Sequence, residues 1–137
     1  MAAINDNAAI AMDDITQAVG YGDKTKLDKA LIRTLGEGIH PIQIIRAASR
    51  HFLRLHEAAG IVASGKDPDI AMKSLKPPVM FMHVDKFRLQ LQRWHPARIR
   101  DALDLLTMAE MDCKTTGEPV VAICWRTLMR ITQAANH

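Results

Sequence analysis

Apolar residues recur at intervals of three and four along most of this chain, and no stretch keeps a convincing alternation of apolar and polar residues. Leu27, Leu31 and Leu35 show the spacing clearly, since they fall on one stripe of a helix. A period near 3.6 places side chains on one face of an α-helix, whereas a period of two is typical of a strand. The pattern therefore predicts an all-α protein built as a helical bundle.

Proline, glycine and capping residues divide this pattern into separate helices. Asp23 can cap a helix that stops at Gly36 and Gly38. Pro41 and Pro68 each suit the first position of a helix. The expected helices run from Asp13 or Asp14 to about Val19, from Asp23 to Leu35, from Pro41 to Val62, from Pro68 to Leu75, from His83 to Trp94, from Pro96 to Cys113 and from Val120 to Ala134. We therefore expect a single bundle of about six to seven helices.

The N-terminal residues do not fit the bundle pattern. Residues 4–12 carry scattered apolar side chains ahead of the first predicted cap. They are consistent with a fraying terminus or with the stub of a longer protein cut at a domain boundary. We expect residues 1–12 to be a linker or the end of a preceding domain, and residues 13–137 to form the helical domain.

The composition limits the class of protein. Hydrophobic residues make up 48% of the 137 residues and charged residues 24%, as in an average globular domain. This balance excludes a disordered tail, a collagen-like fibre and a disulfide-framework miniprotein. No apolar run is long enough to span a membrane, and the N-terminus lacks the features of a secretory signal. We expect a soluble, cytoplasmic protein with no membrane contact.

Positive charge is concentrated in the middle of the chain. Residues 41–100 carry eleven basic and four acidic side chains, within a net charge of +3 for the whole sequence. Arg46, Arg50 and Arg54 are four residues apart, which puts their guanidinium groups on one stripe of a helix. A basic segment of this kind suits an acidic partner, although a solvated helix face has the same composition.

Two further arginines, Arg126 and Arg130, repeat the spacing of four on the last predicted helix. Such pairs bind the phosphates of a nucleic acid or the carboxylates of a partner subunit, and they also occur on solvated faces. The sequence leaves these alternatives open. We take all five arginines of the two stripes as candidate contacts to a partner or to DNA.

An apolar connector follows two consecutive prolines. Pro77 and Pro78 end the preceding helix, and Val79, Met80 and Phe81 come directly after them. These side chains either pack on the bundle or contact a partner, because exposed methionine and phenylalanine are common at interfaces. We take the three as candidate apolar contacts.

The sequence contains no recognisable catalytic, cofactor or metal site. Its glycine pairs stand at helix exits, without the preceding strand and the Gly-Lys-Ser/Thr of a phosphate loop. The histidines lack ligand spacing, since His51 and His56 are five apart and point in different directions from a helix. Cys113 and Cys124 fit no zinc or redox spacing and are expected to be reduced thiols. We therefore expect no catalytic residues, no cofactor, no metal and no enzyme activity for this chain by itself.

Several short motifs occur in a fixed order along residues 13–135. They are Asp14-Ile15-Thr16-Gln17-Ala18-Val19, Gly22-Asp23, Leu35-Gly36-Glu37-Gly38-Ile39-His40-Pro41, Ile44-Ile45-Arg46-Ala47, Arg50-His51-Phe52-Leu53-Arg54-Leu55, Lys76-Pro77-Pro78-Val79-Met80-Phe81, Gln92-Arg93-Trp94, Ala109-Glu110 and Lys114-Thr115-Thr116-Gly117-Glu118-Pro119. In this order they resemble the C-terminal domain of the bacterial DNA polymerase III delta subunit, most strongly its alphaproteobacterial members.

The resemblance implies a helical collar domain, which assembles with the gamma/tau and delta-prime subunits into the clamp loader. That complex loads the sliding clamp during DNA replication, and the delta subunit is a non-catalytic component of the polymerase III holoenzyme, a transferase complex. The N-terminal region of a delta subunit opens the clamp, so clamp binding is not expected of this chain. DNA contact within the full complex stays open.

Two hypotheses follow from these observations. The first is a protein-binding collar domain, which predicts association with gamma/tau and delta-prime. The alternative is a small basic helical DNA-binding protein that uses Arg46, Arg50 and Arg54 on phosphates. The alternative predicts binding that weakens steeply with salt, because each phosphate contact releases counterions.

Overall fold

The computed structural model describes the backbone of residues 2–136 and the side chains of residues 8–136; Met1 and His137 lie outside this range. The described part of the chain forms seven α-helices and one short 3-10 turn with no strand, which confirms the predicted all-α class. The elements are α1 (Ala2–Tyr21), α2 (Lys24–Gly36), α3 (Pro41–Ala63), α4 (Pro68–Ser74), the 3-10 turn η1 (Phe81–His83), α5 (Val84–Arg93), α6 (Pro96–Cys113) and α7 (Val120–Ala134).

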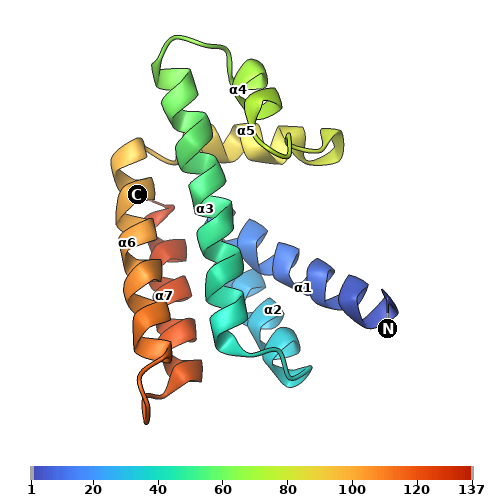
Figure 1. The fold of residues 1–137 in the computed structure, drawn as a ribbon, viewed down its shortest axis with the longest axis vertical. Helices are drawn as coiled ribbons and strands as arrows, with labels where there is room; N and C mark the ends of the chain where they lie inside the picture. Colours follow the sequence, from blue (N-terminus) through green and yellow to red (C-terminus); the bar gives the residue numbers. More distant parts are fainter. Residues whose placement is uncertain (1, 137) are drawn as a thin grey trace.

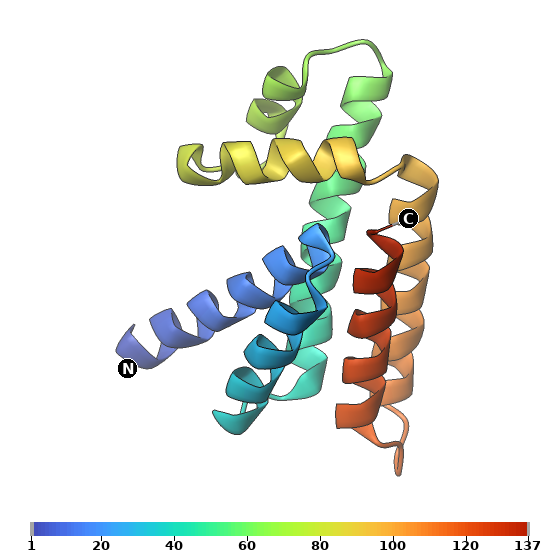
Figure 2. The ribbon, with the colours of Figure 1, turned by 180° about the vertical axis from the view of Figure 1, so that it is seen from behind.

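Helix α3 is the central element of the bundle (Figure 1). Along one part of α3, α6 and α7 pack on one side and the α1–α2 pair on the other, and from behind α7 lies between α6 and α2 (Figure 2). The short helices α4 and α5 cover the opposite end of α3, with α5 running across it. The wide apolar face of α3 explains its central place, because six of its apolar residues are completely buried: Ile44, Ile45, Ala48, Phe52, Leu55 and Ala58.

Three helices begin with the same local device, a capping side chain followed by proline. The Nδ1 atoms of His40 and His95 accept the backbone N–H two residues further on, at 3.1 Å and 3.2 Å. Asp67 makes the same contact through Oδ1 at 2.8 Å. The next residue is proline, which has no N–H to satisfy and a backbone angle suited to the first helical turn. These caps confirm the predicted helix starts at Pro41 and Pro68.

The first helix is longer than the sequence predicted. We expected it to start at Asp13 or Asp14, and this start is wrong, because α1 runs continuously through both positions. Residues 8–12 are rich in alanine, the strongest helix former, so the helix extends through them without needing a cap at the aspartates. Ala11 is also buried, so this part of α1 packs against the bundle.

A polar network is buried where α1, α3 and α5 meet. The Gln90 side chain accepts a hydrogen bond from His51 Nε2 at 2.5 Å and donates one to Gln17 Oε1 at 2.8 Å. The indole N–H of Trp94 donates to the carbonyl oxygen of Gly20 at 2.9 Å. Burial lowers the pKa of His51, so its ring is held neutral near neutral pH. These bonds connect three helices and fix α5 against the end of α1.

Candidate functional site

The arginine stripe of α3 does not face a single open surface. Arg46 Nε lies 3.3 Å from Glu110 Oε2 on α6, and Lys114 reaches the same oxygen at 3.3 Å. Arg50 instead lines a shallow groove toward α1, and Arg54 is half-buried. Four residues span slightly more than one helical turn, so each arginine of the stripe is rotated by about 40° round the helix axis from the one before it. The structure therefore assigns Arg46 to a helix–helix contact and leaves Arg50 as the more open member.

Glu110 is the anion that holds Arg46 in place. Partial burial favours the protonated carboxyl, but hydrogen bonds from Lys114 and Arg46 outweigh this effect and lower the pKa of Glu110. The carboxylate therefore stays ionised at neutral pH. An exposed ion pair of this kind contributes little to stability, but it positions the Arg46 side chain on α6.

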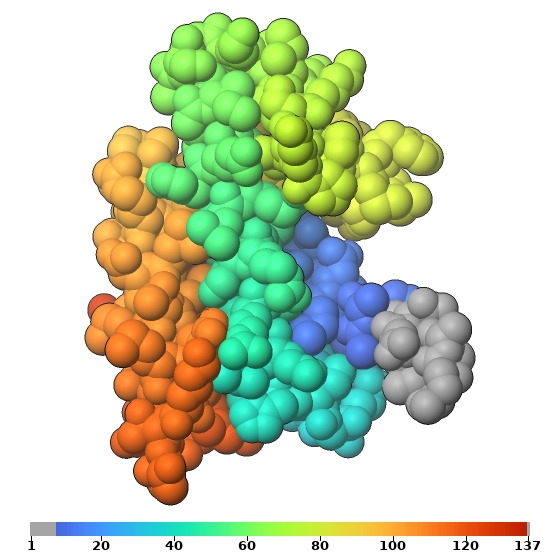
Figure 3. Space-filling view, viewed as in Figure 1, coloured from blue at the N-terminus to red at the C-terminus, as the bar shows by residue number. Residues whose placement is uncertain are grey.

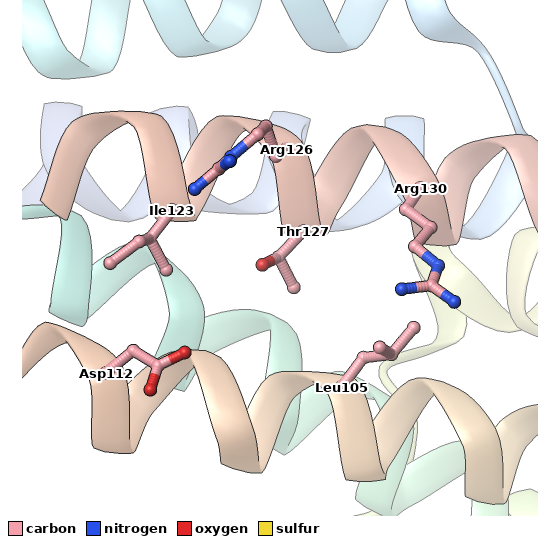
Figure 4. Close-up of a pocket in the computed structure, with 6 residues that line it drawn as sticks. All are labelled: Leu105, Asp112, Ile123, Arg126, Thr127 and Arg130. Atoms are coloured by element: carbon pink, nitrogen blue, oxygen red, sulfur yellow. The ribbon is translucent and has the colours of Figure 1, made fainter. Parts of the chain in front are cut away.

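Arg126 and Arg130 lie beside a groove of about 350 Å³ between α6 and α7 (Figure 4). Within residues 8–136 neither guanidinium forms an ion pair, and Arg126 Nε makes a contact of 3.3 Å with the carbonyl oxygen of Ala122 on its own helix. The groove is lined by Leu105 and Asp112 from α6 and by Ile123, Arg126, Thr127 and Arg130 from α7.

The groove between α6 and α7 combines an apolar floor with charged walls. Leu105 and Ile123 supply the apolar contact, and the two arginines supply donors on one side. Met108, which is 61% exposed, is three residues after Leu105 and so extends the same side of α6. Sequence reasoning missed Met108, although its spacing from Leu105 was visible. The arrangement suits a partner segment that presents an apolar side chain and a carboxylate.

The apolar connector divides into an inward and an outward part. Val79 packs against the core, and its backbone N–H donates to the carbonyl oxygen of Met72 at 3.1 Å. Met80 and Phe81 point outward, with 59% and 86% of their surface exposed. Met82, which directly follows, is 58% exposed and belongs with them. Val79 therefore packs on the bundle, whereas a partner contact stays a prediction for Met80 and Phe81.

The thiols and imidazoles of residues 8–136 make no cluster with metal-ligand geometry. Among the described residues, no group of three or more His, Cys, Asp or Glu side chains could hold a metal ion. Both cysteines are free thiols, and burial raises the pKa of Cys124 to about 12. Burial, followed by the charges of Asp112 and Glu110, also raises the pKa of Cys113. None of the helices in the described range is long and apolar enough to cross a bilayer.

Comparison with known proteins gives an informative match. The chain is similar to the probable DNA polymerase III subunit delta of Rickettsia prowazekii (strain Madrid E), with 33% identity over 78 residues. These residues are 57% of this chain and 24% of the Rickettsia protein, so the chain spans about a quarter of that relative's length. No protein-family model and no solved structure matches the chain. The predicted resemblance to delta subunits is confirmed over this matched stretch.

Proposed function

We propose that this chain is the C-terminal oligomerisation domain, or collar domain, of a DNA polymerase III delta subunit. The supporting observation is the 33% identity over 78 residues to a probable delta subunit, in a chain that folds as a helical bundle. In this role the chain is a non-catalytic, cytoplasmic module. It holds the delta subunit to the gamma/tau and delta-prime subunits of the clamp loader, which loads the sliding clamp during replication.

We place one contact to a neighbouring subunit at the groove between α6 and α7. Arg126 and Arg130 line this groove without an ion-pair partner among the described residues, and Leu105 and Ile123 form its floor. A neighbouring helix with a carboxylate beside an apolar residue would satisfy both features. Met108 adds apolar area at the edge, where it stays exposed in the chain by itself.

Association with the purified gamma/tau and delta-prime subunits tests this proposal, measured by size-exclusion chromatography and calorimetry. We expect a complex at about micromolar concentration, corresponding to roughly −8 kcal/mol. Arg130→Glu should weaken it by at least about tenfold, because it reverses the charge beside the groove. Arg100→Glu is the matched control, since Arg100 is exposed on a different face of α6. The absence of any complex would exclude the collar role, and equal loss in both variants would exclude this groove.

DNA binding through α3 is a second candidate function. Arg50 and Arg54 favour it, since neither forms an ion pair among residues 8–136, whereas Arg46 is engaged by Glu110. A fluorescence titration with duplex and primed DNA at two salt concentrations tests this candidate. Binding that weakens steeply with salt, and less steeply in Arg50→Gln, would support it. The absence of binding at low salt would exclude it.

A further inference from the structure

The segment before α5 presents three consecutive large apolar side chains to solvent. Met80, Phe81 and Met82 are 59%, 86% and 58% exposed, and Phe81 is the most exposed large hydrophobic residue described. Figure 3 shows this part of the chain, in yellow-green, standing out from the body of the molecule. Exposing a phenylalanine ring forgoes roughly 1.5–3 kcal/mol of burial free energy. A contiguous exposed apolar group of this kind is typical of an interaction site.

Phe81 forms one wall of a groove of about 280 Å³ between α4 and α5, which we call the Phe81 groove. Met72, Val79 and Val84 give it an apolar lining, while Asp69, Lys73 and Arg88 supply its polar side chains. Met72 is almost completely buried, so the lining is continuous with the core of the protein. The groove therefore has the size and polarity to hold an apolar side chain from another molecule.

Ion pairs hold the two sides of the Phe81 groove together. Arg88 on α5 donates to Asp69 on α4 at 2.5 Å and to Asp85 on its own helix at 2.9 Å. The hydrogen bond from Val79 to Met72 ties the connector to α4 at 3.1 Å. A ligand segment consequently meets a preformed surface, which lowers the entropic cost of binding.

The charge around the Phe81 groove is positive. Both carboxylates at this surface, Asp69 and Asp85, are already bound by Arg88. Lys73 lines the groove, is exposed, and forms no ion pair among residues 8–136. One unpaired cation, Lys73, therefore remains in an otherwise apolar groove.

We propose that the Phe81 groove binds an acidic peptide segment of another protein, anchored by an apolar side chain between α4 and α5. An aspartate or glutamate side chain beside the anchor would face Lys73. A second copy of this chain is disfavoured, because its own groove would bring like charges together. The groove is concave, and Arg88 binds the carboxylates beside it, so it suits a peptide segment better than a flat lipid surface. This inference goes beyond the collar role, since it concerns a different surface.

Selection of random peptides on the 137-residue chain, followed by fluorescence anisotropy with the selected peptides, tests this proposal. We expect acidic peptides with an aromatic or aliphatic anchor. Phe81→Ser should weaken their binding by at least about tenfold, whereas Ile32→Ser, at another exposed apolar site on α2, should not change it. Lys73→Glu should weaken binding and reduce its salt dependence, and Lys29→Glu on α2 is the matched control.

Three results would overturn the proposal. The first is a selected set that lacks acidic residues or binds Phe81→Ser as well as the original chain. The second is that no peptide binds, but anionic lipid vesicles bind the original chain and not Phe81→Ser. That result would indicate a membrane contact at this surface. The third is a concentration-dependent dimer in light scattering that Phe81→Ser abolishes. Association with gamma/tau and delta-prime should be unchanged in Phe81→Ser, so failure here is distinguishable from failure of the collar role.

Discussion

Replacing Gly20 by alanine should destabilise this protein, although alanine is the better helix former. Gly20 is in the last turn of α1, where α5 approaches closely. A Cβ atom added at Gly20 would lie 2.5 Å from Cδ and 2.8 Å from Nε2 of Gln90, closer than van der Waals contact allows. The Gln90 amide is completely buried, so it must move within the core to make room.

The cost of that movement follows from the bonds of Gln90. Its hydrogen bonds to His51 and Gln17 measure 2.5 Å and 2.8 Å. A net buried hydrogen bond contributes about 0.5–1.5 kcal/mol, so losing both costs about 1–3 kcal/mol. Alanine in a helix recovers at most about 1 kcal/mol relative to glycine. We expect a net loss of up to about 2 kcal/mol, which lowers Tm by up to roughly 8 °C in a chain of this size.

Urea unfolding followed by circular dichroism measures this loss, and Gly60→Ala is the matched control. Gly60 lies near the end of α3, and a Cβ added there meets nothing within 4 Å. The same substitution should therefore stabilise the protein, by up to about 1 kcal/mol. In a Gln90→Ala background, Gly20→Ala should no longer be destabilising, because the clash is gone. If Gly20→Ala is as stable as the original chain, Gln90 moves without losing its bonds and the reasoning is wrong.

Three further predictions follow from buried groups. Burial lowers the pKa of His51, so the unfolded chain binds more protons than the folded chain in mildly acidic solution. The free energy of unfolding should therefore decrease as the pH drops below about 6.5. Urea unfolding of His51→Gln should show a smaller decrease over the same pH range. With a pKa of about 12, Cys124 should not react with Ellman's reagent at pH 8 in the folded Cys113→Ser variant and should react fully in denaturant. Trp94→Phe removes the donor to the Gly20 carbonyl and should cost about 1–3 kcal/mol of unfolding free energy, whereas a loss below about 0.5 kcal/mol would mean that the bond contributes little.

Helix boundaries were predictable where one residue determines them locally. In each of three helices a capping side chain accepts a backbone N–H, and the proline after it fixes a backbone angle suited to the first turn. Both effects act within two residues, so His40, Asp67 and His95 mark helix starts without help from the rest of the fold. The start of α1 has no such residue, and there the prediction placed a cap at Asp13 or Asp14 that the alanine-rich segment made unnecessary. A capping residue therefore marks a helix start only where the residues before it do not themselves favour a helix.

The buried network was beyond sequence reasoning for a different reason. Gln17, His51 and Gln90 come from three helices, and no pattern within one helix relates them. The single available signal is the position of Gln90, which is three residues after Phe87 and four before Trp94 and so lies on the apolar face of α5. A polar residue in that register needs partners, but only tertiary packing determines which helices supply them.

The two arginine stripes show the same limit for a binding surface. A spacing of four determines how the guanidinium groups follow one another on a helix, but it contains no information about the neighbouring helix. Arg46 meets Glu110 across 64 residues of sequence and becomes part of a helix contact, whereas Arg130 lies beside a groove with no carboxylate within ion-pair distance in the described chain. An arginine already paired within the domain must lose that partner before it binds another, and an unpaired one does not. Charge reversal at Arg130 should therefore affect association with a partner more than charge reversal at Arg46, and the reverse order would mean that the α3–α6 pair opens on binding.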